Sequence, residues 1–378
     1  MRLLIYGDIG GSGGYIRYCK GLLGSRSIPE DIEVWFISSL SFYKDLVPLD
    51  PGIHIITHPW IISRNRFFRY LWYLWVYPQL VRKIKPDAEF YPSGKLRVYL
   101  RKACAISTCH NLLLFDRKEL DNVKSKKEKR YFQRARKDYA KSFQKSDALI
   151  FLSNHSKKWV CNEISGIKQT TVIAHGLDPA FLLRQKRSYE LGERINILYV
   201  SPIYSYKHHI EVVQAVKILR ESSGFDICLK LVGEGDSSVA TNLKQFVHFE
   251  NVCEFISITG PTDYTFLPKE YISADIFVFA SSCETFGITI LEAMGSRLPI
   301  ACSNRTGLNE ILKDAGIYFN PEDPEIIARA LQKLLYDIHL RETLGERAYK
   351  YALEYTWKDS ALETFNYLKK VGRTSLHK

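Results

Sequence analysis

Short apolar runs alternate with amphipathic stretches along most of the chain. This alternation is typical of β-α repeats, in which the buried strands of a parallel sheet are joined by helices. It predicts an α/β fold with two series of strands. They are 2–7, 33–38, 53–57, 103–108, 147–152 and 171–174, and then 195–200, 227–232, 252–256, 275–280 and 298–302.

A break in the pattern divides the chain. Residues 176–193 are polar and basic, contain Pro179 and show little periodicity, which is typical of a linker. The 378 residues exceed what a single α/β core usually holds. We therefore expect one domain over residues 1–178 and a second over residues 190–355, with a last helix over residues 356–371.

Composition and charge narrow the class of protein. Hydrophobic residues make up 46% and charged residues 25%, as in a globular protein, and the net charge of +12 favours an anionic partner. The chain has no apolar run of about 18 residues, and its first apolar run is too short for a signal peptide. The eight cysteines form no Cys-x-x-Cys pair. We expect a cytoplasmic protein with reduced cysteines.

Residues 63–85 stand out because aromatic side chains lie between arginines and lysines. Such a composition suits a helix that lies in a membrane interface, so peripheral contact with the cytoplasmic face of an anionic membrane is one interpretation. A buried crossover helix with basic ends is the other. A second basic stretch, residues 124–145, is more polar and predicts a helix with a solvated face.

A glycine-rich loop follows the first predicted strand, at residues 7–15. Glycines allow backbone amides to approach a ligand, and the helix that follows adds positive potential, so the loop is a candidate cradle for phosphate or sugar. It lacks the Gly-Lys-Ser/Thr ending of a P-loop, which disfavours a nucleoside triphosphatase. A purely structural glycine turn remains the alternative.

Two glutamates mark a second candidate site, directly after the predicted strand 275–280. Ligands of open parallel sheets bind beyond the carboxyl ends of strands, where Glu284 lies. Glu292 follows about two helical turns later and can reach the same crevice. The backbone amides of Phe286 and Gly287 lie at the helix start, where they suit hydroxyl or phosphate groups.

The segment 275–301 resembles the signature of the group-one, family-four retaining glycosyltransferases, in which two glutamates with seven residues between them follow a buried strand. Other segments resemble family motifs in the same order along the chain. Lys207 matches the lysine that contacts the donor phosphates, and His110 matches the site beside the sugar. The remaining matches are residues 13–18, which include Gly13 and Gly14, together with 153–154, 175–178, 231–235 and 303–310.

The resemblance implies a GT-B fold, in which two Rossmann-like domains face each other across a cleft and the last helix returns to the N-terminal domain. It implies an acceptor-binding first domain and a second domain that binds the nucleotide sugar. Glu284 would orient the hexose, Glu292 the ribose, and His110 would face the sugar. Lys207 would neutralise the diphosphate. The expected catalytic residues are Glu284, His110 and Lys207, and the expected donor contacts are Gly13, Gly14, Lys207, Glu284, Phe286, Gly287, Ile288 and Glu292.

The chain departs from the family at one position. The family commonly has an arginine soon after the first strand of the second domain, and Pro202 stands there. Either Lys207 acts with a second cation, from His208, His209 or Arg305, or the donor is held more weakly. The chain contains no Asp-x-Asp motif, so we expect no metal and no cofactor beyond the donor.

The substrate follows less directly from the sequence. Residues 204–209 are a variant associated with mannosyl- and rhamnosyl-transferring members, and the expected acceptor is a glycan or lipid-linked oligosaccharide of surface polysaccharide synthesis. One alternative is a nucleotide-sugar epimerase on the same fold. The other is a catalytically silent protein that binds a nucleotide sugar or a membrane. Nucleic-acid binding lacks any motif beyond charge.

Overall fold

The computed structural model describes residues 1–7, 13–46, 48–62, 65–96, 103–121, 123 and 126–376, and the chain divides into two compact units. The first unit contains Met1–Phe115, Lys127–Gly176 and Thr356–Lys378. The second contains Asp116–Lys126 and Leu177–Tyr355. The sequence-based division places the short segment Asp116–Lys126 in the first domain, whereas its contacts group it with the second unit.

A seven-stranded parallel sheet forms the centre of the first unit, with the strand order β3-β2-β1-β4-β5-β6-β7. The order reverses between β1 and β4, as in a Rossmann-like fold. The strands are β1 (Arg2–Tyr6), β2 (Glu33–Ser38), β3 (Ile53–Thr57), β4 (Ala88–Tyr91), β5 (Cys104–Thr108), β6 (Ala148–Phe151) and β7 (Gln169–Val172).

Helices connect these strands. They are α1 (Gly13–Leu23), α2 (Leu40–Leu46), α3 (Pro59–Ile62), α4 (Arg66–Leu71), the π-helical turn η1 (Trp72–Val76), α5 (Tyr77–Ile84), the 3-10 turn η2 (Leu113–Phe115), α7 (Lys126–Lys145), α8 (Asn154–Glu163) and α16 (Trp357–Leu376). None of the helices in the described part of the chain is long and apolar enough to cross a membrane.

The second unit has a six-stranded parallel sheet with the order β10-β9-β8-β11-β12-β13. Its order reverses between β8 and β11. The strands are β8 (Arg194–Val200), β9 (Asp226–Val232), β10 (Ile256–Gly260), β11 (Ile276–Phe279), β12 (Ile300–Ser303) and β13 (Gly316–Phe319). Two α/β domains, each built on a parallel sheet, confirm the predicted fold class.

Helices and short turns complete the second unit. They are α6 (Arg117–Asp121), η3 (Pro179–Phe181), η4 (Ser205–Lys207), α9 (His209–Ser223), α10 (Ser237–Phe249), α11 (Leu267–Ser273), α12 (Ile288–Gly295), α13 (Leu308–Leu312), α14 (Pro324–Tyr336) and α15 (Ile338–Ala352). The segment between η3 and β8 has no regular secondary structure, in agreement with the predicted linker character of residues 176–193.

The prediction of a strand at residues 252–256 is wrong. Val252 lies in a turn, because its backbone N–H donates to Val247 at the end of α10, and the strand begins only at Ile256. The sequence pattern also missed β4 and β13, which are four residues each. These errors concern short strands, for which an apolar run carries little positional information.

The basic and aromatic segment forms one continuous helical stretch through α4, η1 and α5, because the backbone at both ends of η1 stays right-handed helical. One face of the stretch contributes Trp72, Tyr77 and Ile84 to the core of the first unit. The opposite face is exposed. The segment is therefore a crossover helix, as one interpretation predicts, but part of its apolar surface stays exposed in the described structure.

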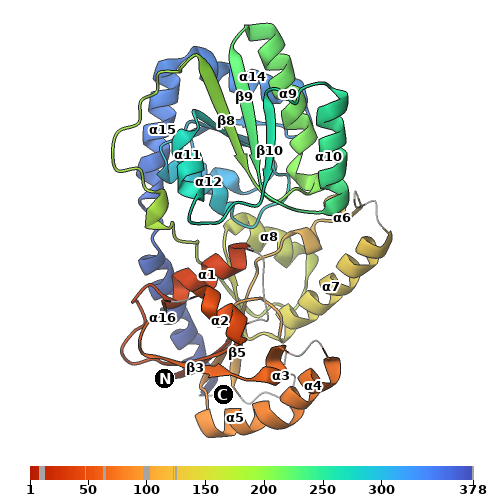
Figure 1. The fold of residues 1–378 in the computed structure, drawn as a ribbon. Helices are drawn as coiled ribbons and strands as arrows, with labels where there is room; N and C mark the ends of the chain where they lie inside the picture. The colour runs from red at the N-terminus through yellow and green to blue at the C-terminus, as the bar shows by residue number, and fades with distance from the viewer. Residues whose placement is uncertain are drawn as a thin grey trace. The chain divides into compact units, whose positions relative to one another are not determined.

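Helix α16 returns to the first unit, where it packs against α1, β4 and β5 (Figure 1). The packing against α1 is close at Gly21, because a Cβ atom there would stand 2.1 Å from the Trp357 ring. Gly176 allows a similar approach to the Trp357 backbone. Two glycines therefore fix the position at which the last helix begins.

Candidate active site

Lys207 and Glu284 form a buried ion pair in the second unit. Lys207 lies at the end of η4, after β8, and Glu284 lies in the loop after β11. The Lys207 Nζ contacts Glu284 Oε1, and the two side chains are only 7% and 16% exposed. Because β8 and β11 are the neighbours between which the strand order reverses, the pair occupies the position where open α/β sheets bind ligands.

The surroundings of Lys207 hold its ammonium group in place. The Nζ lies 5.0 Å from the centre of the Phe279 ring and 5.2 Å from that of Tyr206, within the range of cation–π attraction. The Tyr199 hydroxyl donates to the Lys207 carbonyl oxygen over 2.6 Å. A buried ion pair adds little to stability after the cost of desolvation, so its position at a ligand site is more informative than its energy.

The turn after Glu284 requires a glycine. Gly287 caps α12 with φ of 92°, and a Cβ atom there would stand 2.3 Å from Leu308 Cδ2. Phe286 is buried, with its ring centre 6.0 Å from that of Tyr355, so it anchors the turn, and Ile288 begins the helix. The backbone N–H groups predicted to face the donor therefore lie at a rigid helix start.

Glu292 lies on α12, with its side chain directed into the second unit. It is 1% exposed, and its Oε2 accepts a hydrogen bond of 2.8 Å from the Tyr271 hydroxyl. The structure thus brings Lys207 and Glu284 into contact, while the hydrogen bond of Glu292 is to a tyrosine of α11. The contact of Glu292 with a ribose stays a prediction.

The structure distinguishes among the candidates for a second cation. Burial lowers the pKa of His209 to about 3, and its ring stacks on Tyr199, so it is neutral at pH 7. Arg305 is half exposed and pairs with Glu322 over 3.2 Å. His208 Nε2 lies 3.0 Å from Ser282 Oγ. Of the three alternatives, His209 is therefore excluded as a cation.

His110 lies in the first unit, just after β5, within a cluster of aromatic and imidazole rings. Its ring centre lies 4.6 Å from that of Tyr18, 6.1 Å from that of Tyr15 and 5.7 Å from that of His175. Burial lowers the pKa of His110 to about 4, and burial together with the charge of His110 lowers that of His175 well below its usual range. Both imidazoles are therefore neutral at pH 7, which suits hydrogen bonding rather than ion pairing.

The glycine loop is described only in part. Helix α1 begins at Gly13, and no atom of the described residues lies within 4 Å of a Cβ placed on Gly14. Residues 8–12 of the loop lie outside the described residues. The Tyr15 ring packs on Phe42 at 5.5 Å, so this tyrosine is a core residue.

Sequence reasoning missed two kinds of residue. Thr306 is 5% exposed, and its hydroxyl has no hydrogen-bond partner in the described structure, although it lies in the loop 303–310 that resembles the family's nucleotide loop. The second is the pair of Ser282 and Glu119, whose side chains are 2.7 Å apart. Ser282 lies two residues before Glu284. No sequence pattern relates Glu119 to Ser282, because 163 positions separate them.

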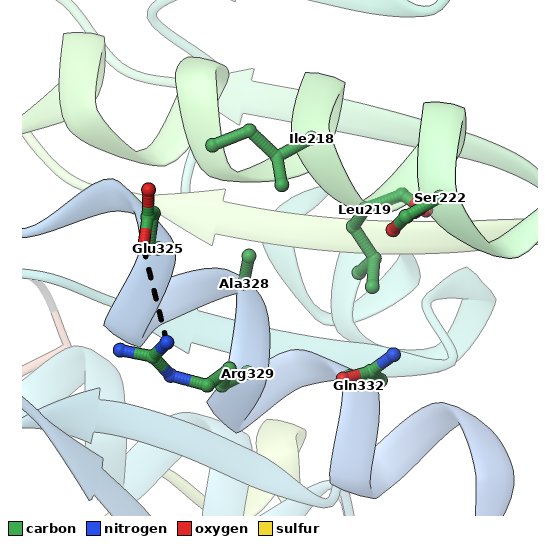
Figure 2. Close-up of a pocket in the computed structure, with 7 residues that line it drawn as sticks. All are labelled: Ile218, Leu219, Ser222, Glu325, Ala328, Arg329 and Gln332. Atoms are coloured by element: carbon green, nitrogen blue, oxygen red, sulfur yellow. Dashed lines mark hydrogen bonds and ion pairs between the residues drawn. The ribbon is translucent and has the colours of Figure 1, made fainter.

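The described residues include no group of three or more His, Cys, Asp and Glu side chains that could hold a metal ion. Figure 2 shows a hollow elsewhere in the second unit, between α9 and α14, where Glu325 pairs with Arg329 over 3.8 Å. A larger hollow of about 410 Å³ lies beside Arg194 of β8 and Lys230 of β9. Neither is lined by Lys207, Glu284 or Glu292.

Comparisons with known proteins match the part of the chain that contains Lys207, Glu284 and Glu292. Residues 184–351 match the model of the family described as "Glycosyl transferases group 1". O-antigen chain mannosyltransferase B of Escherichia coli is 29% identical over 193 residues, which are 50% of this chain and 50% of that protein. The matches cover between 22% and 50% of the length of the first four curated relatives.

Two solved structures share the fold of the whole chain. Sucrose-phosphate synthase from Thermosynechococcus elongatus has a TM-score of 0.75 at 18% identity, over 99% of this chain and 100% of that one. Anabaena HepE, solved in complex with UDP and glucose, has a TM-score of 0.72 at 14% identity, over 98% and 99%. At these identities the likeness concerns the fold alone.

Proposed function

We propose that this chain is a group-one glycosyltransferase, which moves a hexose from a nucleotide sugar to a glycan or lipid-linked acceptor with retention of configuration. The observation that carries the proposal is the ion pair of Lys207 and Glu284 at the point where the strand order reverses. A cation for phosphate and an acceptor for sugar hydroxyls are the two groups that such a donor needs.

On binding, the donor would replace the contact that Lys207 and Glu284 make with each other. Lys207 would bind the diphosphate, and Glu284 would accept hydrogen bonds from the hexose hydroxyls. As the bond between sugar and phosphate breaks, negative charge develops on the leaving diphosphate, and a buried cation stabilises that charge more than an exposed one does. In the retaining reaction the departing phosphate assists attack on the same face of the sugar, so a glycosidase-like carboxylate pair is not required.

Metal independence is part of the proposal. A diphosphate carries negative charge that either a divalent metal or basic side chains must neutralise. Lys207 supplies one positive charge, and His208 and Arg305 lie on loops of the same unit, after β8 and β12. Activity that persists in the presence of a chelator supports this assignment.

The sugar and the acceptor are proposed from the relatives. The matched Escherichia coli protein is described as an O-antigen chain mannosyltransferase, which favours mannose or the related sugar rhamnose and a surface polysaccharide such as lipopolysaccharide. His110 would face the sugar as a neutral hydrogen-bonding group, since burial keeps its pKa at about 4. Gly13 and Gly14 would let the start of α1 approach the substrate, and Glu292 would contact the ribose.

An exposed apolar surface of the first unit supports the proposal of a lipid-linked acceptor. The aromatic face, which we define as Phe67, Phe68, Tyr70, Leu74 and Trp75, is between 39% and 62% exposed. It holds five of the fifteen exposed large hydrophobic residues in the described part of the chain, within nine positions. Isolated apolar residues are normal on a surface, but such a group marks an interaction site.

We infer that the aromatic face contacts an anionic lipid surface. Residues 66–85 contain no acidic residue, and the exposed Arg82 and Lys83 lie in the last turn of the same helical stretch. Tyrosine and tryptophan favour the headgroup region, and each nearby basic residue adds attraction to an anionic leaflet. A partner protein with a complementary apolar groove would need no such bias towards positive charge.

A panel of nucleotide sugars tests the proposed function. The protein is incubated with each donor, with a chelator, and with soluble or lipid-linked glycan acceptors, and both the transferred sugar and the thermal midpoint are measured. A donor that raises the midpoint and gives transfer with the anomeric configuration unchanged supports the proposal. Donor epimerisation without transfer would favour the epimerase alternative, and binding without turnover would favour a silent nucleotide-sugar protein.

A further inference from the structure

Ser282 ties together the two loops that carry the ion pair. Its backbone N–H donates to the Tyr206 carbonyl oxygen over 2.9 Å, and its Oγ lies 3.0 Å from His208 Nε2. These two partners flank Lys207 in the chain, and Ser282 itself lies two residues before Glu284. One serine therefore fixes the loop of the cation against the loop of the carboxylate.

A carboxylate from a distant segment holds the serine in turn. Ser282 Oγ donates to Glu119 Oε1 over 2.7 Å, and Glu119 is 4% exposed. A hydroxyl has one proton to donate, and the Glu119 carboxylate at 2.7 Å is a nearer acceptor than the Tyr206 carbonyl oxygen at 3.2 Å. With the proton on the side of Glu119, the contact with His208 is a hydrogen bond only if His208 Nε2 donates to the serine oxygen. The bonds thus run in one direction, from His208 through Ser282 to Glu119, and end on a carboxylate, which strengthens them.

His208 occupies a backbone conformation that a histidine adopts at a cost. Its φ and ψ are 50° and 42°, in the left-handed region, where a residue other than glycine costs roughly 1–2 kcal/mol. Glycine would avoid that cost but would have no side chain to reach Ser282. Strain of this kind persists where the surroundings fix the residue, and here the contact with Ser282 does so.

Glu119 reaches this position on α6, within the segment Asp116–Lys126 that leaves the first unit and joins the second. Asp116 Oδ1 accepts from the Glu119 backbone N–H over 3.2 Å, which fixes the start of the short helix. The neighbouring Lys118 makes a separate, exposed ion pair with Glu322. Of these two contacts with the rest of the second unit, the contact of Glu119 leads to the ion pair of Lys207 and Glu284, and that of Lys118 does not.

We propose that Glu119 and Ser282 are positioning residues of the donor site, which act on transfer through the placement of Lys207 and Glu284. This inference rests on the proposed function. Neither residue contacts the donor in this scheme. Glu119 fixes the rotamer of Ser282, and Ser282 fixes the residues on both sides of Lys207, so that the cation lies where charge develops on the diphosphate.

The test compares Glu119→Ala, Ser282→Ala, the double variant and Glu119→Gln in the full chain. Glu119→Ala and Ser282→Ala should each lower kcat/KM for the donor by about 10- to 100-fold, since small misplacement of reacting groups has effects of that size. The double variant should match the more affected single variant within about threefold, because both changes remove one chain of bonds. Glu119→Gln keeps an acceptor oxygen and should retain activity within about threefold of the wild type.

Lys118→Ala is the matched control, because it removes the other attachment of the same helix. Equal loss in Lys118→Ala would show that the attachment of α6 matters and not the bond to Ser282, and would overturn the inference, as would full activity of Glu119→Ala. Additive effects in the double variant would also contradict it. If Glu119→Ala does not fold, the kcat/KM values of Ser282→Ala and Glu119→Gln test the inference instead. An inactive wild type would instead overturn the proposed function.

Discussion

Lys207 and Glu284 are 77 positions apart in the chain, and their side chains meet at the carboxyl ends of the neighbouring strands β8 and β11. The Lys207 side chain is buried and that of Glu284 is partly buried, and each compensates the charge of the other. Removal of one partner therefore leaves an unpaired buried charge, which is strongly unfavourable. Under the proposed function, donor binding and stability are therefore linked at this pair.

Replacement of either Lys207 or Glu284 should abolish transfer. Each single replacement should also lower stability more than replacement of both residues by apolar ones does. Glu284→Ala and Lys207→Ala should each lower kcat by at least about 100-fold, as loss of a group that stabilises developing charge does. Each single variant should also lose stability, whereas Lys207→Met with Glu284→Leu should regain much of it, because an apolar pair carries no desolvation cost. Donor turnover and urea denaturation measure the two effects. A single variant that transfers sugar normally would contradict the assigned site.

A substitution at Gly287 should destabilise the second unit and impair the site. Gly287→Ala combines a positive φ of 92° with a contact of 2.3 Å to Leu308, so a loss of about 2–4 kcal/mol in the free energy of unfolding is expected. Gly224→Ala is the control, since its φ is 72° but no atom lies within 4 Å of the added Cβ. Urea denaturation should show the smaller loss for Gly224→Ala. Equal losses would mean that the contact with Leu308 relaxes freely.

The aromatic face should be necessary for binding to anionic vesicles. Phe67→Ser with Trp75→Ser removes two side chains that are about 60% exposed, and should weaken association with phosphatidylglycerol vesicles by at least about tenfold. Binding should also fall as salt rises, because the basic residues act through screened attraction. Co-sedimentation with vesicles measures both effects.

Phe249→Ser provides a matched control, because Phe249 is 84% exposed on α10 of the second unit and does not belong to the aromatic face. It should bind vesicles as the wild type does. Equal binding of all variants, or equal binding to neutral phosphatidylcholine, would contradict the membrane proposal. A dimer in gel filtration that the double substitution converts to a monomer would identify a second copy of the chain as the occupant.

Acidification should destabilise the fold through its buried histidines. The pKa of His110 is about 4 in the folded protein and 6.5 in an unfolded chain, so the unfolded state binds more protons between these values. Stability therefore falls as the pH falls from about 6.5 towards 4, at up to roughly 1.4 kcal/mol per pH unit for this group. His209, with a pKa of about 3, should act in the same direction.

Thermal midpoints between pH 7 and pH 5 test this expectation before most carboxylates titrate. His110→Asn should show a shallower decline than the wild type, because one buried group no longer takes up a proton on unfolding. His248→Asn is the control, since His248 is an exposed residue of α10. The same decline in the wild type and His110→Asn would show that His110 does not titrate as its burial implies.

The sequence predicted the two sheets and the strand-end positions of Lys207 and Glu284 because those signals are local, but it did not predict the ion pair between the two side chains. Lys207 and Glu284 each follow an apolar strand, and ligands of parallel sheets gather at such strand ends. The sequence pattern did not predict strand β4, because Glu89 interrupts its apolar run. The structure accommodates this carboxylate at 1% exposure, where its Oε2 accepts from the Tyr91 hydroxyl over 2.6 Å.

Contacts between distant segments could not be predicted from local sequence patterns. Glu119 lies in a short polar helix, for which a solvated position is the ordinary expectation, and only the folded chain shows its bond to Ser282. The π-helical turn η1 was equally hidden, because one extra residue in a helical turn changes the exposed face without altering composition. Local patterns therefore predicted the strand-end residues and not the residues that position them.

The path of the segment Asp116–Lys126 has a consequence for recombination between relatives. The second unit is completed by residues that precede its main portion by more than fifty positions. A chimera joined only near residue 177 would combine Ser282 of one parent with the α6 helix of the other. Exchange of donor specificity between such proteins would therefore succeed more often when this short segment travels with the sequence that follows the joint.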